Sequence, residues 1–229
     1  MSTGLPPTHS AEPDHRIPLA PQALSADVYE LLLEKLLDPS CPPGSTLNIE
    51  RLAATWNVSP TPVREALSRA AATGMVTHRQ NYGYRVAPVL PLDEYQALVD
   101  VRALIEPYCA ARAAEFISDA QLADLEGFQA LMEQAATGPT TIEYRPYLRA
   151  DIRFHRNIAT AARNQFAVSA FDGWNIHFFR FQRFGGRSVA DAEQSHIEHR
   201  AILAAIRSHD PEAAKEAMAI HIEGVRHRS

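Results

Sequence analysis

The stretch Asn57–Ala70 reads NVSPTPVREALSRA and decides the fold of the segment around it. Ser59 is a good helix N-cap, and Pro60 and Pro62 fall in the first turn, where helix N–H groups have no intrahelical partner. Apolar residues then recur at helical spacing and leave a small polar face around Arg64. Short side chains permit close approach to the DNA major groove, and a guanidinium can bridge guanine O6 and N7 or hold a phosphate. The stretch therefore predicts a DNA-recognition helix.

A shorter helix precedes the recognition helix. Asn48 can cap it, and its apolar face includes Leu52 and Trp56. Asn57 fills the turn between the two helices, because asparagine accepts a left-handed backbone more readily than most residues. Two short helices joined by such a turn predict a helix-turn-helix.

A β-hairpin is predicted after the recognition helix. Residues 76–79 alternate in side-chain character, Gln80–Gly83 supplies a turn, and Tyr84–Val86 returns. Helix, turn, helix and hairpin together predict a winged helix, and a structural three-helix module with an ordinary surface arginine is the alternative. The residues expected to contact DNA are Arg51, Ser59, Thr61, Arg64, Ser68, Arg79, Asn81, Tyr82 and Gly83.

Short motifs spread over this segment carry a family resemblance: Pro43-Gly44, Leu47, Leu52-Ala53, Val58-Ser59, Thr61–Leu67, Gly74–Val76 and Gly83–Val86. Together they resemble the DNA-binding domain of the GntR family of bacterial transcription regulators. The resemblance covers the segment without a gap, and it implies binding to double-stranded operator DNA.

The segment also departs from the pattern that it resembles. The family commonly places an arginine after the serine of the turn and another two residues before the leucine of the first helix, where this sequence has Pro60 and Glu50. Arg64 alone remains of that usual basic set, while Arg51 and Arg79 are offset from it. The operator sequence therefore cannot be carried over from relatives.

Charge is distributed unevenly along the 229 residues, of which 46% are hydrophobic. The net charge of −5 is not typical of a nucleic-acid-binding protein, but the charge differs between segments of the chain. Residues 51–90 carry five Arg against one acid, which gives +4, whereas residues 91–229 carry 15 Lys and Arg against 19 acids, which gives −4. This is the distribution expected of a DNA-reading module attached to an acidic partner domain.

Membrane and secretion signals are not found in the sequence. It has no apolar run of about 18 residues and no basic-then-apolar N-terminal pattern. Cys41 and Cys109 lack CxxC spacing, so reduced thiols are expected. We therefore expect a cytoplasmic protein without a membrane partner. The resemblance to bacterial regulators implies association with the nucleoid when the protein is bound to DNA.

Composition and periodicity divide the chain into four segments. Residues 1–20 are rich in Pro, Ser, Thr and His without an apolar period, and they predict a mobile tail. Residues 21–87 form the winged helix, whose first helix is expected at about Ala26–Leu37. Residues 88–91 contain two prolines and predict a stiff linker, and residues 92–229 form a second domain.

The second domain shows helical patterns and no strand pattern. Helical segments are expected at about 92–116, 119–136, 141–161, 164–183, 189–208 and 210–227. Six helices in this length predict an all-α antiparallel bundle with a core large enough to hold a pocket. The whole chain is thus predicted to be mainly α.

Polar residues on the inner faces of the bundle form a candidate metal site. Asp151 and His155 are four residues apart and share one face of a helix, while His199 and His221 border the apolar stripes of the last two helices. One carboxylate and three imidazoles could hold a divalent transition metal with positions left open. The alternative is that these are satisfied or exposed histidines in a chain that has ten; among the others, His196 is the rival ligand.

A second resemblance bears on this site. The motifs that carry it are Asp151–His155, Asn164, Glu198–Ile202, His209–Pro211 and Ala219–His221, with Arg102 and Glu106 fitting the same pattern. They resemble the FCD effector domain in the fatty-acid-regulator branch of the GntR family, in its shorter six-helix subtype. The resemblance implies that Asp151, His155, His199 and His221 bind metal. It also implies that Arg102 grips an anionic effector, whereas the residue types alone leave open a pair between Arg102 and a helix acid.

These observations predict a ligand-responsive, DNA-binding transcription regulator, most simply a homodimer, whose effector is a small carboxylate. Zinc is the first choice of metal because three imidazoles and one carboxylate suit it, with nickel and manganese as the next candidates. The alternative function is a metal-dependent helical-bundle enzyme. A di-iron bundle needs two Glu-x-x-His motifs, and the sequence offers that spacing only at Glu193–His196.

Overall fold

The computed structural model describes residues 21–135, 141–184 and 192–228. Within these residues the chain is mostly helical with one small sheet, as the sequence predicts. The predicted tail, residues 1–20, lies outside the described residues. The elements in chain order are α1 (Pro21–Leu36), β1 (Thr46–Leu47), α2 (Ile49–Trp56), α3 (Pro60–Ala72), β2 (Val76–Arg79), β3 (Gly83–Val86), α4 (Leu92–Phe116), α5 (Asp119–Gln134), α6 (Thr141–Ala161), α7 (Gln165–Phe184), α8 (Ala192–Arg207) and α9 (Pro211–Arg228).

The helix-turn-helix consists of α2 followed at once by α3. The Asn48 side chain caps α2 by accepting a hydrogen bond of 2.8 Å from the backbone N–H of Arg51. Asn57 adopts a φ of 54°, which is the left-handed turn predicted for it. Ser59 occupies the N-cap position of α3 but makes no side-chain capping bond. The start of α3 is therefore preorganised by Pro60 at its first position and not by a hydroxyl cap.

The wing is an antiparallel sheet in the order β1-β3-β2. The predicted hairpin is present, and its turn contains positive φ values of 66° at Asn81 and 72° at Gly83. The sequence did not predict β1, in which Leu47 pairs with Tyr84. A strand of two residues is too short for an alternating pattern to reveal it.

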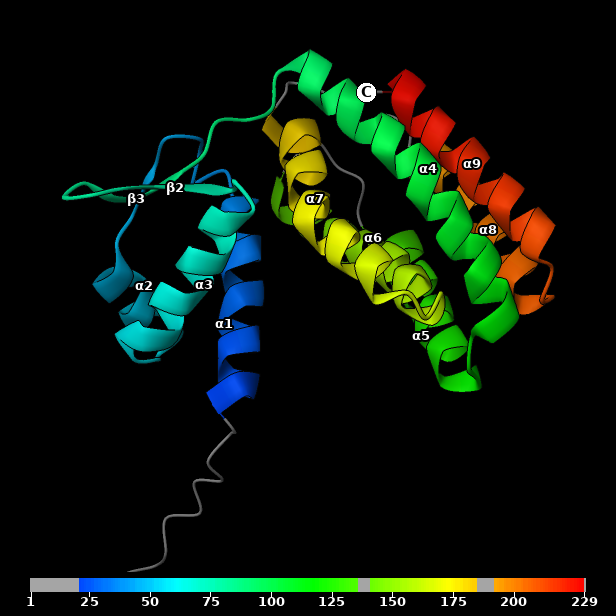
Figure 1. Ribbon diagram of the computed structural model, residues 1–229, viewed down its shortest axis with the longest axis horizontal. Helices are drawn as coiled ribbons and strands as arrows, with labels where there is room; N and C mark the ends of the chain where they lie inside the picture. Colours follow the sequence, from blue (N-terminus) through cyan, green and yellow to red (C-terminus); the bar gives the residue numbers. More distant parts are fainter. Residues whose placement is uncertain (1–20, 136–140, 185–191, 229) are drawn as a thin grey trace, which may run out of the picture.

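Helices α4 to α9 form the bundle, drawn in green to red in Figure 1 and separate from the blue-to-cyan winged helix. Their bounds lie within three residues of those predicted, because capping signals define several ends. Ser118 and Gln121 make a capping box at α5, and Asp210 accepts from the Ala213 N–H at the start of α9. The long helix α4 packs against α6, α8 and α9. Among the described residues, no helix is both long and apolar enough to cross a membrane.

Polar contacts join the winged helix to α7 of the bundle. His177 Nε2 lies 2.6 Å from the carbonyl oxygen of Thr73, the C-cap residue of α3. Arg180 is buried and donates a hydrogen bond to the carbonyl of Ala87, directly after β3. Both the recognition helix and the wing therefore contact the same helix of the bundle.

Candidate metal centre and nucleic-acid face

The residues expected to contact DNA are all exposed. Arg51 lies on α2, and α3 turns Thr61, Arg64 and Ser68 outward, with Ser59 exposed at its N-cap, while it buries Val63, Ala66, Leu67 and Ala70. Nη2 of Arg64 lies 3.9 Å from Oε1 of Glu50, and the two side chains are 59% and 70% exposed. Solvent weakens an ion pair that is this exposed. The guanidinium therefore remains available to a DNA groove or a phosphate.

The wing presents a second group of exposed side chains. Arg79 ends β2, Gly83 begins β3, and Asn81 and Tyr82 lie in the turn between them. Tyr82 is 72% exposed, which is unusual for an aromatic side chain without a partner surface. The tip thus combines an exposed ring with a cation of the kind that can contact a phosphate.

In the bundle, the predicted metal ligands His155, His199 and His221 come together from α6, α8 and α9. Each can offer one ligand atom, and these atoms all lie within 4.8 Å of one another. Nε2 of His155 lies 3.3 Å from Nε2 of His199. All three side chains are buried, with His199 completely so. Three nitrogen donors facing one another in a dry interior have the composition and spacing of a transition-metal site.

The fourth predicted ligand, Asp151, lies beside this trio. Its Oδ1 is 3.4 Å from Nε2 of His199, and it is 7% exposed. Burial raises the pKa of the Asp151 carboxyl, although the nearby His155 and Arg102 oppose that shift. A bound cation would favour the ionised carboxylate, so Asp151 suits the site chemically.

Two glutamates lie beside the Nδ1 atoms of two of the histidines, His155 and His221. Oε2 of Glu106 lies 2.7 Å from Nδ1 of His155, and Oε2 of Glu198 lies 2.9 Å from Nδ1 of His221. These contacts leave the Nε2 atoms for a cation and fix how the rings are turned. Sequence reasoning assigned no role to either glutamate, although the carboxylate directly before His199 was a signal that could have been followed.

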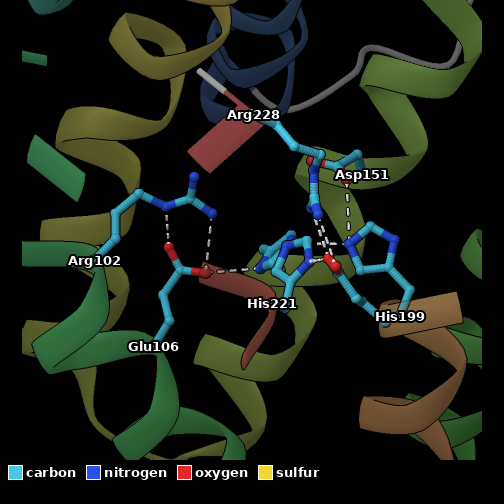
Figure 2. Close-up of polar contacts among 8 residues, drawn as sticks. Arg102, Glu106, Asp151, His199, His221 and Arg228 are labelled. Atoms are coloured by element: carbon cyan, nitrogen blue, oxygen red, sulfur yellow. Dashed lines mark hydrogen bonds and ion pairs between the residues drawn. The ribbon is translucent and has the colours of Figure 1, made fainter. Parts of the chain in front are cut away.

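Two arginines border the buried cluster, and Figure 2 shows Arg102 to the left of His221 and Arg228 reaching toward it from above. Arg102 is 3% exposed and grips Glu106, with Nε 2.5 Å from Oε1 and Nη2 3.3 Å from Oε2. This is the pairing with a helix acid that the residue types had left open. Arg228, which the sequence did not indicate, pairs with Glu198 from the last turn of α9.

The buried environment keeps His199 and His221 neutral. Burial lowers the pKa of His199 well below its usual value, and the neighbouring His221 and His155 lower it further. Burial also lowers the pKa of His221 to about 4, although the hydrogen bond to Glu198 opposes the shift. Neutral imidazoles are the form that binds metal. The rival ligand His196 instead packs edge-on against Tyr147, with ring centroids 5.6 Å apart.

Comparison with known protein families assigns both parts of the chain. Residues 24–86 match the family of bacterial regulatory proteins called the gntR family, and residues 97–224 match the FCD domain. The chain is 27% identical over 201 residues to the probable D-xylose utilization operon transcriptional repressor of Paenarthrobacter nicotinovorans, covering 87% of this chain and 85% of that protein.

A second relative agrees with this assignment, and a solved structure shows the same fold. The Nta operon transcriptional regulator of Aminobacter aminovorans is 30% identical over 157 residues, which are 68% of this chain and 72% of that protein. The E. coli McbR/YncC structure has the same fold, with a TM-score of 0.71 at 20% identity over 89% of this chain and 95% of that one. The matched families and relatives are transcription regulators and not enzymes. The chain is a DNA-binding transcription regulator that belongs to the gntR family and carries an FCD domain.

Proposed function

We propose that this regulator binds a divalent metal ion in its helical bundle, uses that ion to bind a small organic acid, and changes its operator binding in response. The observation that carries the proposal is the buried trio His155, His199 and His221, with ligand atoms within 4.8 Å of one another. Polar groups buried this deeply require partners, and a cation would give all three imidazoles one. Asp151 would be the fourth ligand.

Zinc is the first candidate for the ion. Three imidazoles and one carboxylate are common zinc ligands, and nickel and manganese remain the next candidates because they also accept nitrogen and oxygen donors. The ion would supply Lewis-acid positions at which carboxylate oxygens of an effector can bind. The outer contacts of Glu106 and Glu198 support a metal function, because metal-bound histidines usually donate their second N–H to such acceptors.

Arg102 is the proposed effector contact within the bundle. Arg102 already pairs with Glu106, so the carboxylate of an incoming effector would meet a compensated ion pair and not an isolated cation. Arg102 would then orient the effector through hydrogen bonds and would add little net positive charge. The proposal predicts that effector binding is weak without metal, since the ion supplies the excess positive charge that an anion needs.

On the DNA side, we propose that two copies of the chain bind a symmetric operator. The recognition helix α3 would enter the major groove through Thr61, Arg64 and Ser68, and the wing tip would touch the backbone or minor groove. A homodimer places two such units at a fixed spacing, so a change in the bundle can alter affinity by altering that spacing. The proposed compartment is the bacterial cytoplasm.

Elemental analysis of the purified protein tests the metal, and a thermal-shift screen of small carboxylates, sugar acids and amino acids tests the effector. We expect one bound divalent ion per chain, lost in His199→Ala and retained in His196→Ala. Duplex DNA selected from a random pool should then be released or retained depending on the effector, and chelation should remove that dependence. The metal proposal is wrong if His199→Ala retains the ion, and the sensing proposal is wrong if the chelated protein binds effector with unchanged affinity.

A further inference from the structure

We propose that Arg228, at the end of α9, acts through Glu198 to position His221 as a metal ligand. We call the set Arg228, Glu198 and His221 the C-terminal clamp. The inference rests on the proposed metal site and adds to it a positioning residue that none of the ligand motifs contains. The clamp joins α8 and α9, which are the helices that supply His199 and His221.

The clamp is defined by short contacts around one buried carboxylate. Nη1 of Arg228 lies 2.8 Å from Oε1 of Glu198, and Nη2 lies 2.7 Å from Oε2. The same Oε2 accepts from Nδ1 of His221 at 2.9 Å, while Gln194 donates to Oε1 at 3.2 Å. Glu198 is 6% exposed and His221 is 3% exposed. A bidentate arginine thus fixes the carboxylate that in turn orients the imidazole.

Helical spacing explains how a residue near the end of the chain reaches this site. Arg228 follows His221 by seven residues, so the two side chains share one face of α9. Figure 2 shows Arg228 reaching from the helix end toward the histidines. Because the Glu198 carboxylate is buried, it requires a counter-charge; the pairing with Arg228 satisfies this need without occupying Nε2 of His221.

Gly224 provides the room that the clamp needs. A Cβ atom at this position would lie 2.6 Å from Nη1 of Arg228 and 2.8 Å from Oε1 of Glu198. Real Cβ atoms do not approach other atoms so closely, so Gly224→Ala must shift the Arg228 guanidinium, the Glu198 carboxylate or both. The substitution removes no charged group, and within a helix alanine is intrinsically more favourable than glycine. A single methyl group therefore disturbs the geometry of the clamp while all of its charged groups remain.

The test measures metal affinity by chelator competition and the thermal midpoint of the metal-free protein in parallel. We expect Gly224→Ala and Arg228→Gln to weaken binding of Zn²⁺ by about tenfold, the lower end of the range for outer-shell partners. Gly224→Ala should lower the metal-free midpoint by less than Arg228→Gln does, because it keeps the charge of Arg228 and gains the helix preference of alanine. Arg228→Lys should restore part of the affinity, because lysine keeps the charge but loses the fork.

Matched controls separate this role from a purely structural one. Gly127 is a helical glycine of α5 with nothing within 4 Å of an added Cβ, so Gly127→Ala should raise helix stability and leave Zn²⁺ affinity unchanged. Wild-type Zn²⁺ affinity in both Gly224→Ala and Arg228→Gln would overturn the clamp while leaving the metal site standing. A fall in affinity that tracks an equal fall in metal-free stability would also overturn it. If the wild-type chain binds no divalent ion, the proposed function fails together with the clamp.

Discussion

Nδ1 of His155 lies 2.7 Å from the carboxylate of Glu106, and both side chains are almost completely buried. Arg102 donates to both oxygens of that carboxylate, so a cation, an anion and an imidazole form a row inside the bundle. Burial alone would raise the pKa of Glu106, but the charge of Arg102 and the contact with His155 lower it below its usual value. Glu106 is therefore an anion that serves two partners at once.

Replacement of Glu106 by glutamine should affect both partners. Glu106→Gln keeps the shape but removes the anion that pairs with the buried Arg102, which should cost roughly 3–5 kcal/mol of unfolding free energy. His155 loses its anionic acceptor, so metal affinity should fall by about tenfold or more. Chemical denaturation of the metal-free protein and chelator competition measure the two effects separately.

An exposed ion pair provides the control for Glu106. Glu126 accepts from Arg207 at 2.7 Å, and both side chains are about half exposed. Glu126→Gln should therefore change the unfolding free energy by no more than about 1 kcal/mol and leave metal binding unaltered. Equal stability losses in Glu106→Gln and Glu126→Gln would show that the buried anion makes no special contribution.

The sequence predicted the elements of this fold because their signals are local. Asn48, Ser118 and Asp210 mark helix starts by residue type, and the structure shows each of them accepting a capping hydrogen bond. Asn57 marks a left-handed turn in the same way. The first helix begins at Pro21 and not near Ala26, because the periodic pattern begins later than the helix itself. β1 is too short to carry any pattern.

The candidate metal site was predictable only in its inner layer. Asp151 and His155 share a face by spacing, but the pairing of Glu198 with His221 joins two helices through tertiary packing. Helical periodicity indicates which residues face inward, but it does not indicate which of them contact one another. Arg228 is an example: the sequence shows its spacing from His221, but it does not show that Arg228 contacts Glu198 on α8.

Arg64 should be the main contributor to sequence-specific DNA binding. It is exposed and only loosely paired with Glu50, so Arg64→Ala should leave the fold intact. Loss of one base-reading arginine costs about 1–3 kcal/mol, and a symmetric dimer would lose it twice. Gel shifts on selected duplexes measure the loss, with Arg112→Ala on the bundle surface as the control. Unchanged affinity in Arg64→Ala would remove this residue from the interface.

The wing should contribute binding that does not depend on sequence. Arg79→Ala should lower affinity for selected and random duplexes alike, because an interaction with phosphate carries no base information. The slope of log affinity against log salt should become shallower by about 0.9 for each phosphate that the variant no longer neutralises. Fluorescence anisotropy at several salt concentrations gives this slope. An unaltered slope would mean that Arg79 does not touch the DNA backbone.

The contact between His177 and Thr73 should make the junction of the winged helix and the bundle sensitive to pH. Burial lowers the pKa of His177, the hydrogen bond to the Thr73 carbonyl partly opposes this, and Arg180 lowers it further. The folded pKa thus lies below the unfolded value of about 6.5. As pH falls below that value, the unfolded chain binds a proton that the docked His177 resists, so stability is lost.

His177→Gln should therefore reduce this loss, because glutamine can still donate to the Thr73 carbonyl but does not titrate. Thermal midpoints of the metal-free protein at about pH 7.5 and about pH 5.5 test the prediction. The thermal midpoint of the wild type should fall more between the two pH values than that of His177→Gln. Because both proteins contain the buried histidines of the metal site, the difference reports on His177 alone. His227→Gln is the control, because His227 is 75% exposed near the end of α9 and should behave as the wild type. If His177→Gln and the wild type lose stability equally, protonation of His177 does not disturb the contact between α7 and the recognition helix.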